Sequence, residues 1–118
     1  WYRKALAGVK GLTLNHEPAN TKNTFWMVTA VLDPMLEWPK EKLMAALDKE
    51  DIDSRPMFHP LSSLPAYEGQ AEAVVARKRN EVSYRLSPWG INLPSAMNLT
   101  REQVQRVADT LRRLLAAS

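Results

Sequence analysis

The chain has 118 residues, which is room for one domain with one modest hydrophobic core. Hydrophobic residues make up 45% and charged residues 25%, a composition that excludes a disordered tail. Cysteine is absent, which excludes a disulfide framework, a thiolate metal site and a cysteine nucleophile. That absence suits a reducing compartment, so we expect a cytoplasmic protein. We expect no membrane span, because no apolar run approaches the roughly 20 residues that a transmembrane helix needs.

The first third of the chain predicts a short helix followed by two paired strands. Residues 1–8 carry apolar side chains three or four apart before two glycines, which indicates either the tail of a helix cut from a longer chain or a short terminal helix. Residues 12–15 alternate in polarity and residues 23–32 form the clearest strand, so the polar segment between them predicts an antiparallel pair. Both faces of the second strand are mostly apolar. This predicts a central strand covered on both sides, with Phe25 and Trp26 packed in the core.

The middle of the chain predicts a helix, an extended segment and a long loop. Residues 39–51 begin with a proline at the first helical position and present an apolar stripe opposite a solvated face that includes Lys40. Residues 54–58 are predicted to be extended, because a residue before proline avoids the helical region. Residues 59–69 contain two prolines, two serines and a glycine, which indicates a loop of the kind that often carries function.

The last third predicts two helices around a short extended piece. Residues 70–86 form the first helix, and residues 91–94 are extended, at a sheet edge or ending at their proline. Thr100 and Gln103 form a capping box that starts the final helix. The apolar stripe of the first helix consists of Ala71, Val75, Val82 and Leu86. The element order predicts an α+β fold: a small, mostly antiparallel sheet of three to four strands packed with about three helices.

The residue pattern by itself offers little chemistry. The two histidines, His16 and His59, lie in different loops and lack the spacing of a zinc site. No phosphate-binding loop or dinucleotide fingerprint is present. The arginines of the last two predicted helices are compatible with a nucleic-acid surface, but a net charge of +3 is small for that role and pairing with nearby acids accounts for them. We therefore expect neither a metal ion nor a nucleic acid as partner.

Four segments carry a resemblance to a known family. They are NTFW at 23–26, IDSRPMFHPL at 52–61, LPAY at 64–67 and GINLPS at 90–95. Together and in this order they resemble the C-terminal small domain of the DegT/StrS-type sugar aminotransferases, most closely the perosamine synthases among them. The resemblance covers nearly the whole chain.

The resemblance implies a function that lies partly outside these residues. Such enzymes use pyridoxal phosphate to move an amino group, usually from glutamate, onto a nucleotide-linked keto-sugar. They are homodimers with the active site at the subunit boundary, and the lysine that holds the cofactor lies in a large N-terminal domain. Residues 1–118 would then be a single domain, one piece of a larger two-domain enzyme. We expect this piece alone to be inactive and to bind pyridoxal phosphate weakly or not at all.

The resemblance also places five residues beside the mouth of the active site: Arg55, Phe58, His59, Ser62 and Tyr67. Arg55 would hold a phosphate oxygen with its planar guanidinium, and Tyr67 would pack its ring against the sugar or base. Ser62 departs from the family pattern, because many members carry histidine there. A purely structural role is the alternative for each residue, with Arg55 paired to a nearby acid and Tyr67 packed under its loop. The rival function is a stand-alone α+β binding module for an acidic partner or RNA.

Overall fold

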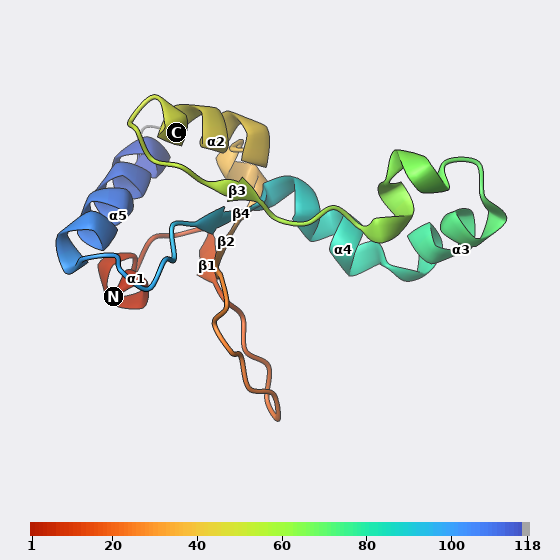
Figure 1. Cartoon of the computed structure of the whole chain (residues 1–118), viewed down its shortest axis with the longest axis horizontal. Helices are drawn as coiled ribbons and strands as arrows, with labels where there is room; N and C mark the ends of the chain where they lie inside the picture. The colour runs from red at the N-terminus through yellow and green to blue at the C-terminus, as the bar shows by residue number, and fades with distance from the viewer. Residues whose placement is uncertain (117–118) are drawn as a thin grey trace.

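The structure is a computed structural model that describes residues 1–116. Its sheet has four antiparallel strands in the order β1-β2-β4-β3 (Figure 1). The strands are β1 (Leu12–Leu14), β2 (Val28–Leu32), β3 (Arg55–Pro56) and β4 (Gly90–Leu93). The helices are α1 (Tyr2–Ala5), α2 (Lys40–Asp48), α3 (Ala71–Arg79), α4 (Glu81–Leu86) and α5 (Arg101–Ala116). The predicted α+β class and antiparallel sheet are confirmed.

The pairing of β1 with β2 follows the sequence prediction, whereas the position of β4 in the sheet differs from it. β1 and β2 form the predicted antiparallel pair, with Thr13 opposite Val31. β4 is not an edge strand: it lies between β2 and β3 and ends before Pro94. The edge on that side is β3, only two residues long, whose proline lacks the N–H that a further strand would need.

One face of the sheet packs against α1, α2 and α5 to form the hydrophobic core. Alternate residues of the two central strands point into it, and the largest side chains buried completely are Leu43, Leu47, Ile91 and Leu111. Each of these four removes enough apolar surface from water to stabilise the fold by about 2–3 kcal/mol. This sheet with its three helices is called the layer below.

The strand β2 is buried only on its helix-facing side, which corrects the prediction that it is covered on both sides, whereas β4 is buried along its whole length. Ala30 and Leu32 are buried, whereas Thr29 and Val31 on the opposite face remain partly exposed. The regular strand begins at Val28 and not at residue 23. The sheet therefore has an open face that can meet something outside the residues described.

Two helix ends of the layer are held by specific hydrogen bonds. The Thr100 and Gln103 side chains each accept from the other's backbone N–H, at 3.3 and 2.8 Å, which confirms the predicted capping box. At the other end of the chain Tyr2 is buried, and its hydroxyl donates to the Pro94 carbonyl at 2.9 Å. Burial raises the pKa of Tyr2 to about 12. Arg112 of α5 donates to the Ala5 carbonyl, so α1 is docked onto α5.

A second part of the molecule projects away from the layer. We call residues 59–86 the arm: two short 3₁₀ turns, Leu61–Ser63 and Pro65–Tyr67, followed by α3 and α4 (Figure 1). The arm lengthens the molecule to 48 Å along its longest axis. Its radius of gyration, 15.6 Å, exceeds the roughly 13–14 Å of a compact chain of this length.

The arm contradicts the single helix predicted over residues 70–86. The helix breaks at Asn80, whose φ of −100° and ψ of +41° lie outside the helical region. The predicted buried stripe is exposed, with Val75 at 52% and Val82 at 57%. Because the helix breaks at Asn80, the predicted stripe does not form one continuous face, and nothing within residues 1–116 covers these side chains.

Among residues 1–116, no helix combines the length and the apolar character that a membrane crossing requires.

Candidate functional site

A groove of about 310 Å³ lies on the open face of the sheet, between the β1–β2 hairpin and the segment that follows β3. Its floor is polar, because Thr29 of β2 and Asn92 of β4 are directly paired and share this face. The complete lining is Asn15, Asn23, Thr24, Trp26, Met27, Thr29, Met57, Phe58 and Asn92. None of these side chains is charged at neutral pH. The groove therefore suits an uncharged ring better than a phosphate.

Hydrogen bonds fix the groove's polar residues in place. Asn92 accepts from the Thr29 hydroxyl at 2.8 Å and donates to the Pro56 carbonyl at 3.3 Å, so one side chain ties three strands together. Asn15 donates to the Met27 carbonyl at 2.8 Å and accepts from the Thr29 N–H, which closes the base of the hairpin. These contacts preorganise the groove before anything binds in it.

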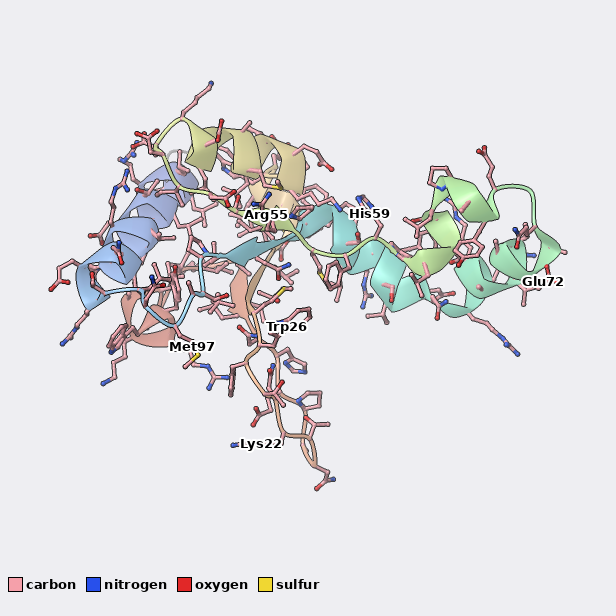
Figure 2. The ribbon with its side chains drawn as sticks, in the orientation of Figure 1. Lys22, Trp26, Arg55, His59, Glu72 and Met97 are labelled. Atoms are coloured by element: carbon pink, nitrogen blue, oxygen red, sulfur yellow. The ribbon has the colours of Figure 1, made fainter. Side chains whose placement is uncertain are left out.

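Two aromatic side chains form the upper wall of the groove. The ring centroids of Trp26 and Phe58 are 6.4 Å apart, and the two residues are 73% and 65% exposed. Trp26 is labelled in Figure 2. The prediction that Phe25 and Trp26 pack in the core is wrong. Phe25 has a φ of +53°, stabilised by its N–H donating to the Asn23 carboxamide at 2.7 Å, so the chain leaves strand geometry here and turns Trp26 outward. Exposed aromatic rings beside fixed amides are typical of a surface that binds a ring.

A buried lysine lies where the arm begins. Lys40 is only 3% exposed, and its ammonium contacts the Met57 carbonyl, the His59 ring and the Ser87 hydroxyl. The prediction that Lys40 belongs to the solvated face of its helix is wrong. Among the five predicted site residues, His59 is therefore a neighbour of this lysine at the start of the arm (Figure 2).

Ser62 and Tyr67 lie together on the arm. Both line two shallow pockets, of about 300 and 340 Å³, beside the 3₁₀ turns. The Ser62 hydroxyl is 2.9 Å from the hydroxyl of Tyr84, which links the loop to α4. The ring of Tyr84 is covered on one side by the Arg77 guanidinium, 5.2 Å from its centroid. Tyr67 is 42% exposed and its phenol is accessible to a ligand.

Arg55 lies apart from the other predicted residues. It is on the edge strand β3, and its guanidinium pairs with the Asp53 carboxylate at 3.1 Å while both side chains are about three-quarters exposed. An ion pair this exposed contributes little stability and is easily exchanged for another anion.

The structure thus distributes the five predicted residues over four places. Phe58 lines the groove, His59 lies at the start of the arm, Ser62 and Tyr67 share the arm loop, and Arg55 lies on the outer strand. Sequence reasoning missed Trp26, Asn92 and Lys40. A signal existed for the first two, because they fall inside the NTFW and GINLPS segments, but no signal in the sequence distinguishes Lys40 from an exposed lysine.

A further hollow, of about 780 Å³, lies along the solvent side of α5. Both signs of charge line it. The Glu50 carboxylate pairs with Arg113 at 2.9 Å, and the Glu50 carbonyl accepts from Arg106. The hollow is an internally paired charged surface and carries no assignment. Residues 1–116 contain no cluster of three or more metal-ligating side chains.

The profile of the DegT/DnrJ/EryC1/StrS aminotransferase family matches residues 1–112. This chain belongs to that family. The GDP-perosamine synthase of Vibrio cholerae is 35% identical over 111 residues, which is 94% of this chain and 29% of the relative. The GDP-perosamine synthase of Caulobacter vibrioides is 30% identical over 98% of this chain and 30% of its own length.

Solved structures agree with the fold of this family member. A crystal structure of DesI with its TDP-sugar product superposes with a TM-score of 0.78 at 22% identity, covering 97% of this chain and 28% of DesI. DesV from S. venezuelae, in complex with a ketimine intermediate, gives a TM-score of 0.69 at 26% identity, with 97% and 29% covered. Both matches cover 97% of this chain. The chain spans less than a third of the length of these relatives.

The described residues do not fit the binding of pyridoxal phosphate by themselves. A lysine that forms a Schiff base needs a desolvated amine that a carbonyl can reach. Lys40 is the one lysine among residues 1–116 that is buried, its amine already contacts three groups, and it lines none of the pockets described here. The groove itself contains neither a lysine nor a basic cradle for the cofactor's phosphate.

Proposed function

We propose that this chain is the C-terminal small domain of a pyridoxal-phosphate-dependent aminotransferase that transfers an amino group, usually from glutamate, to a nucleotide-linked keto-sugar. The observation that carries the proposal is the 35% identity to a GDP-perosamine synthase across 94% of the chain. A GDP-linked sugar is accordingly the first substrate to test. Residues 1–118 act as a single domain, and the cofactor and its lysine belong to a large domain in the rest of the enzyme.

In this proposal the chain provides one wall of the substrate pocket. Trp26 and Phe58 stack on an uncharged ring of the nucleotide sugar, and Asn92 and Thr24 hydrogen-bond to its substituents. Support comes from the exposed position of Thr24 at the groove and from the absence of charged side chains among the lining residues.

The charged and polar ends of the nucleotide sugar are assigned to the other predicted residues. Arg55 exchanges its exposed partner Asp53 for a phosphate oxygen, and Tyr67 packs its ring on the sugar or base. His59 and Ser62 border the path between them.

The exposed apolar side chains of the arm are explained by the same proposal. Monomeric proteins rarely expose contiguous apolar surface, and the arm exposes Leu61, Val74 and Val75 by half or more. We propose that these residues pack against the large domain or against the second subunit of a homodimer. Packing of this kind would also exclude water from the reacting sugar.

The decisive experiment compares two proteins: this chain alone and the same chain extended by its native upstream reading frame. The extended protein is expected to show the visible absorbance of lysine-bound pyridoxal phosphate and to aminate a GDP-linked keto-sugar with glutamate. The chain alone is expected to do neither. Stable cofactor absorbance and turnover by the chain alone would overturn the proposal that the cofactor and its lysine belong to a separate large domain.

The groove is tested in the extended enzyme. Trp26→Ala is expected to raise KM for the nucleotide sugar about fivefold, the equivalent of about 1 kcal/mol of stacking, with a smaller effect on kcat. Met97→Ala is the control, because Met97 is fully exposed and lies outside the groove. Equal KM for both variants would remove Trp26 from the substrate pocket.

A further inference from the structure

Lys40 joins three segments that are far apart in the sequence. It is the first residue of α2, and its Nζ lies 3.4 Å from the Met57 carbonyl oxygen, 3.5 Å from His59 Nδ1 and 3.3 Å from Ser87 Oγ. Met57 and His59 belong to the chain as it enters the arm, and Ser87 belongs to the chain as it returns. We call residues 57–59 and 87–90 the arm root. One amine thus contacts both halves of the arm root.

Burial at this position is unfavourable for a lysine unless hydrogen bonds to its ammonium group offset the lost hydration. An ammonium group loses hydration when it is buried, and residues 1–116 offer it no carboxylate partner. The N-terminal end of a helix also disfavours a positive charge. The three groups surround the amine at 3.3–3.5 Å, the long end of the hydrogen-bond range. Since an ammonium group only donates, the contact with His59 is a hydrogen bond in the tautomer that carries its proton on Nε2. Such contacts are lost together when either half of the arm root moves.

We propose that Lys40 is a positioning residue that fixes the direction of the arm relative to the layer. The contact with Ser87 is the important one for geometry, because α4 ends at Leu86 and passes into the 3₁₀ turn Ser87–Trp89 without a loop. Holding Ser87 therefore holds the axis of α4. The contacts with Met57 and His59 hold the other chain segment of the arm at the same point.

A small rotation at the root is amplified along the arm. α3 and α4 have nine and six residues. At 1.5 Å per residue, they provide roughly 20 Å of helix, so a rotation of about 10° displaces the far end by roughly 3–4 Å. Ser62 and Tyr67 are carried on this arm. If the proposed function holds, Lys40 sets the distance from these residues to the groove without touching the substrate.

The absence of cysteine makes the arm direction directly measurable. The substitutions Val74→Cys on the arm and Ala45→Cys on α2, both at exposed positions, provide attachment sites for two spin labels. Pulsed electron–electron double resonance then gives the distribution of distances between the labels. Neither substrate nor cofactor is needed. The result is therefore independent of whether the chain belongs to an active aminotransferase.

In this background Lys40→Met is expected to at least double the width of the distance distribution, because methionine fills the space and makes no hydrogen bond. Lys42→Met is the matched control on the same helix: Lys42 is exposed, donates to the Glu37 carbonyl and covers the Trp38 ring, and its replacement is expected to leave the width unchanged. Lys40→Arg keeps the charge and the donors and is expected to restore most of the narrow distribution. A distribution for Lys40→Met that superposes on the parent overturns the proposal, even if the melting temperature falls.

Ser87→Ala keeps the test decisive if Lys40→Met does not fold. It removes one acceptor of the lysine and is expected to broaden the distribution by a smaller amount. His59→Ala removes a second acceptor and is expected to add to that broadening. Unchanged distributions in both single variants and in the double variant would equally overturn the role of Lys40.

Discussion

The layer and the arm use apolar side chains in opposite ways. In the layer Leu43, Leu47 and Leu111 are completely buried, whereas in the arm Leu61 is 74% exposed and Val74 is 56% exposed. The helices α2 of the layer and α3 of the arm both have nine residues, so the difference is not one of local structure. It shows that the layer buries its own apolar side chains, while the arm leaves apolar side chains that nothing within residues 1–116 covers, which is what the proposed packing against the rest of the enzyme requires.

The sharpest way to break this comparison is to truncate the same residue type in both regions. Leu111→Ala is expected to lower the free energy of unfolding by about 2–5 kcal/mol, because it leaves a cavity in the core. Leu61→Ala, the matched variant on the arm, is expected to change it by less than about 0.5 kcal/mol. Urea titration of both variants measures the contrast. Comparable losses would show that the arm is packed as tightly as the layer.

The layer is also expected to weaken at alkaline pH through Tyr2. The pKa of Tyr2 is about 12 in the folded chain and about 10 in an unfolded one, so between these values the unfolded state binds fewer protons. The contribution of Tyr2 is complete below pH 10, falls as pH rises above 10, and has declined by about 2–3 kcal/mol by pH 12. Tyr2→Phe removes this loss and is the control. Identical unfolding free energies against pH for the two proteins would place Tyr2 in water.

The smallest of these effects concerns the start of α5, the longest helix of the layer. Thr100→Ala removes the side chain that accepts from the Gln103 N–H and is expected to cost about 1 kcal/mol. Gln103→Ala removes the reciprocal contact and should cost less, since the N-cap residue contributes most of the capping energy. Thermal unfolding by circular dichroism resolves the two. The reverse order would mean that the Thr100 hydroxyl is satisfied by solvent.

The sequence predicted well wherever local chemistry decides the outcome. Thr100 and Gln103 predict a helix start because the side chain of each accepts from the other's backbone N–H. The polar segment between residues 12–15 and 23–32 predicts an antiparallel pair of strands. The motifs that suggested the family also led to Phe58, Ser62 and Tyr67, which lie on surfaces open to a ligand. The roles of these residues in binding stay predictions.

The errors fall where a backbone or an environment departs from the local preference. Alternation through Phe25 and Trp26 assumes a continuous strand, and the positive φ of Phe25 ends that assumption. The apolar spacing of residues 70–86 assumes a cover that residues 1–116 do not supply. Lys40 was assigned to solvent because lysine rarely lies inside, and only the convergence of Met57 and Ser87 on its amine makes burial tolerable.

The sequence by itself determined the class of fold, the paired strands, the cap of the last helix and the family, because each depends on neighbouring residues or on short motifs. The tertiary structure alone decided which face of the sheet stays open, where the arm leaves the layer and which lysine is buried. Those features depend on groups dozens of residues apart, such as Lys40 and Ser87, and no local pattern records that two such segments will meet.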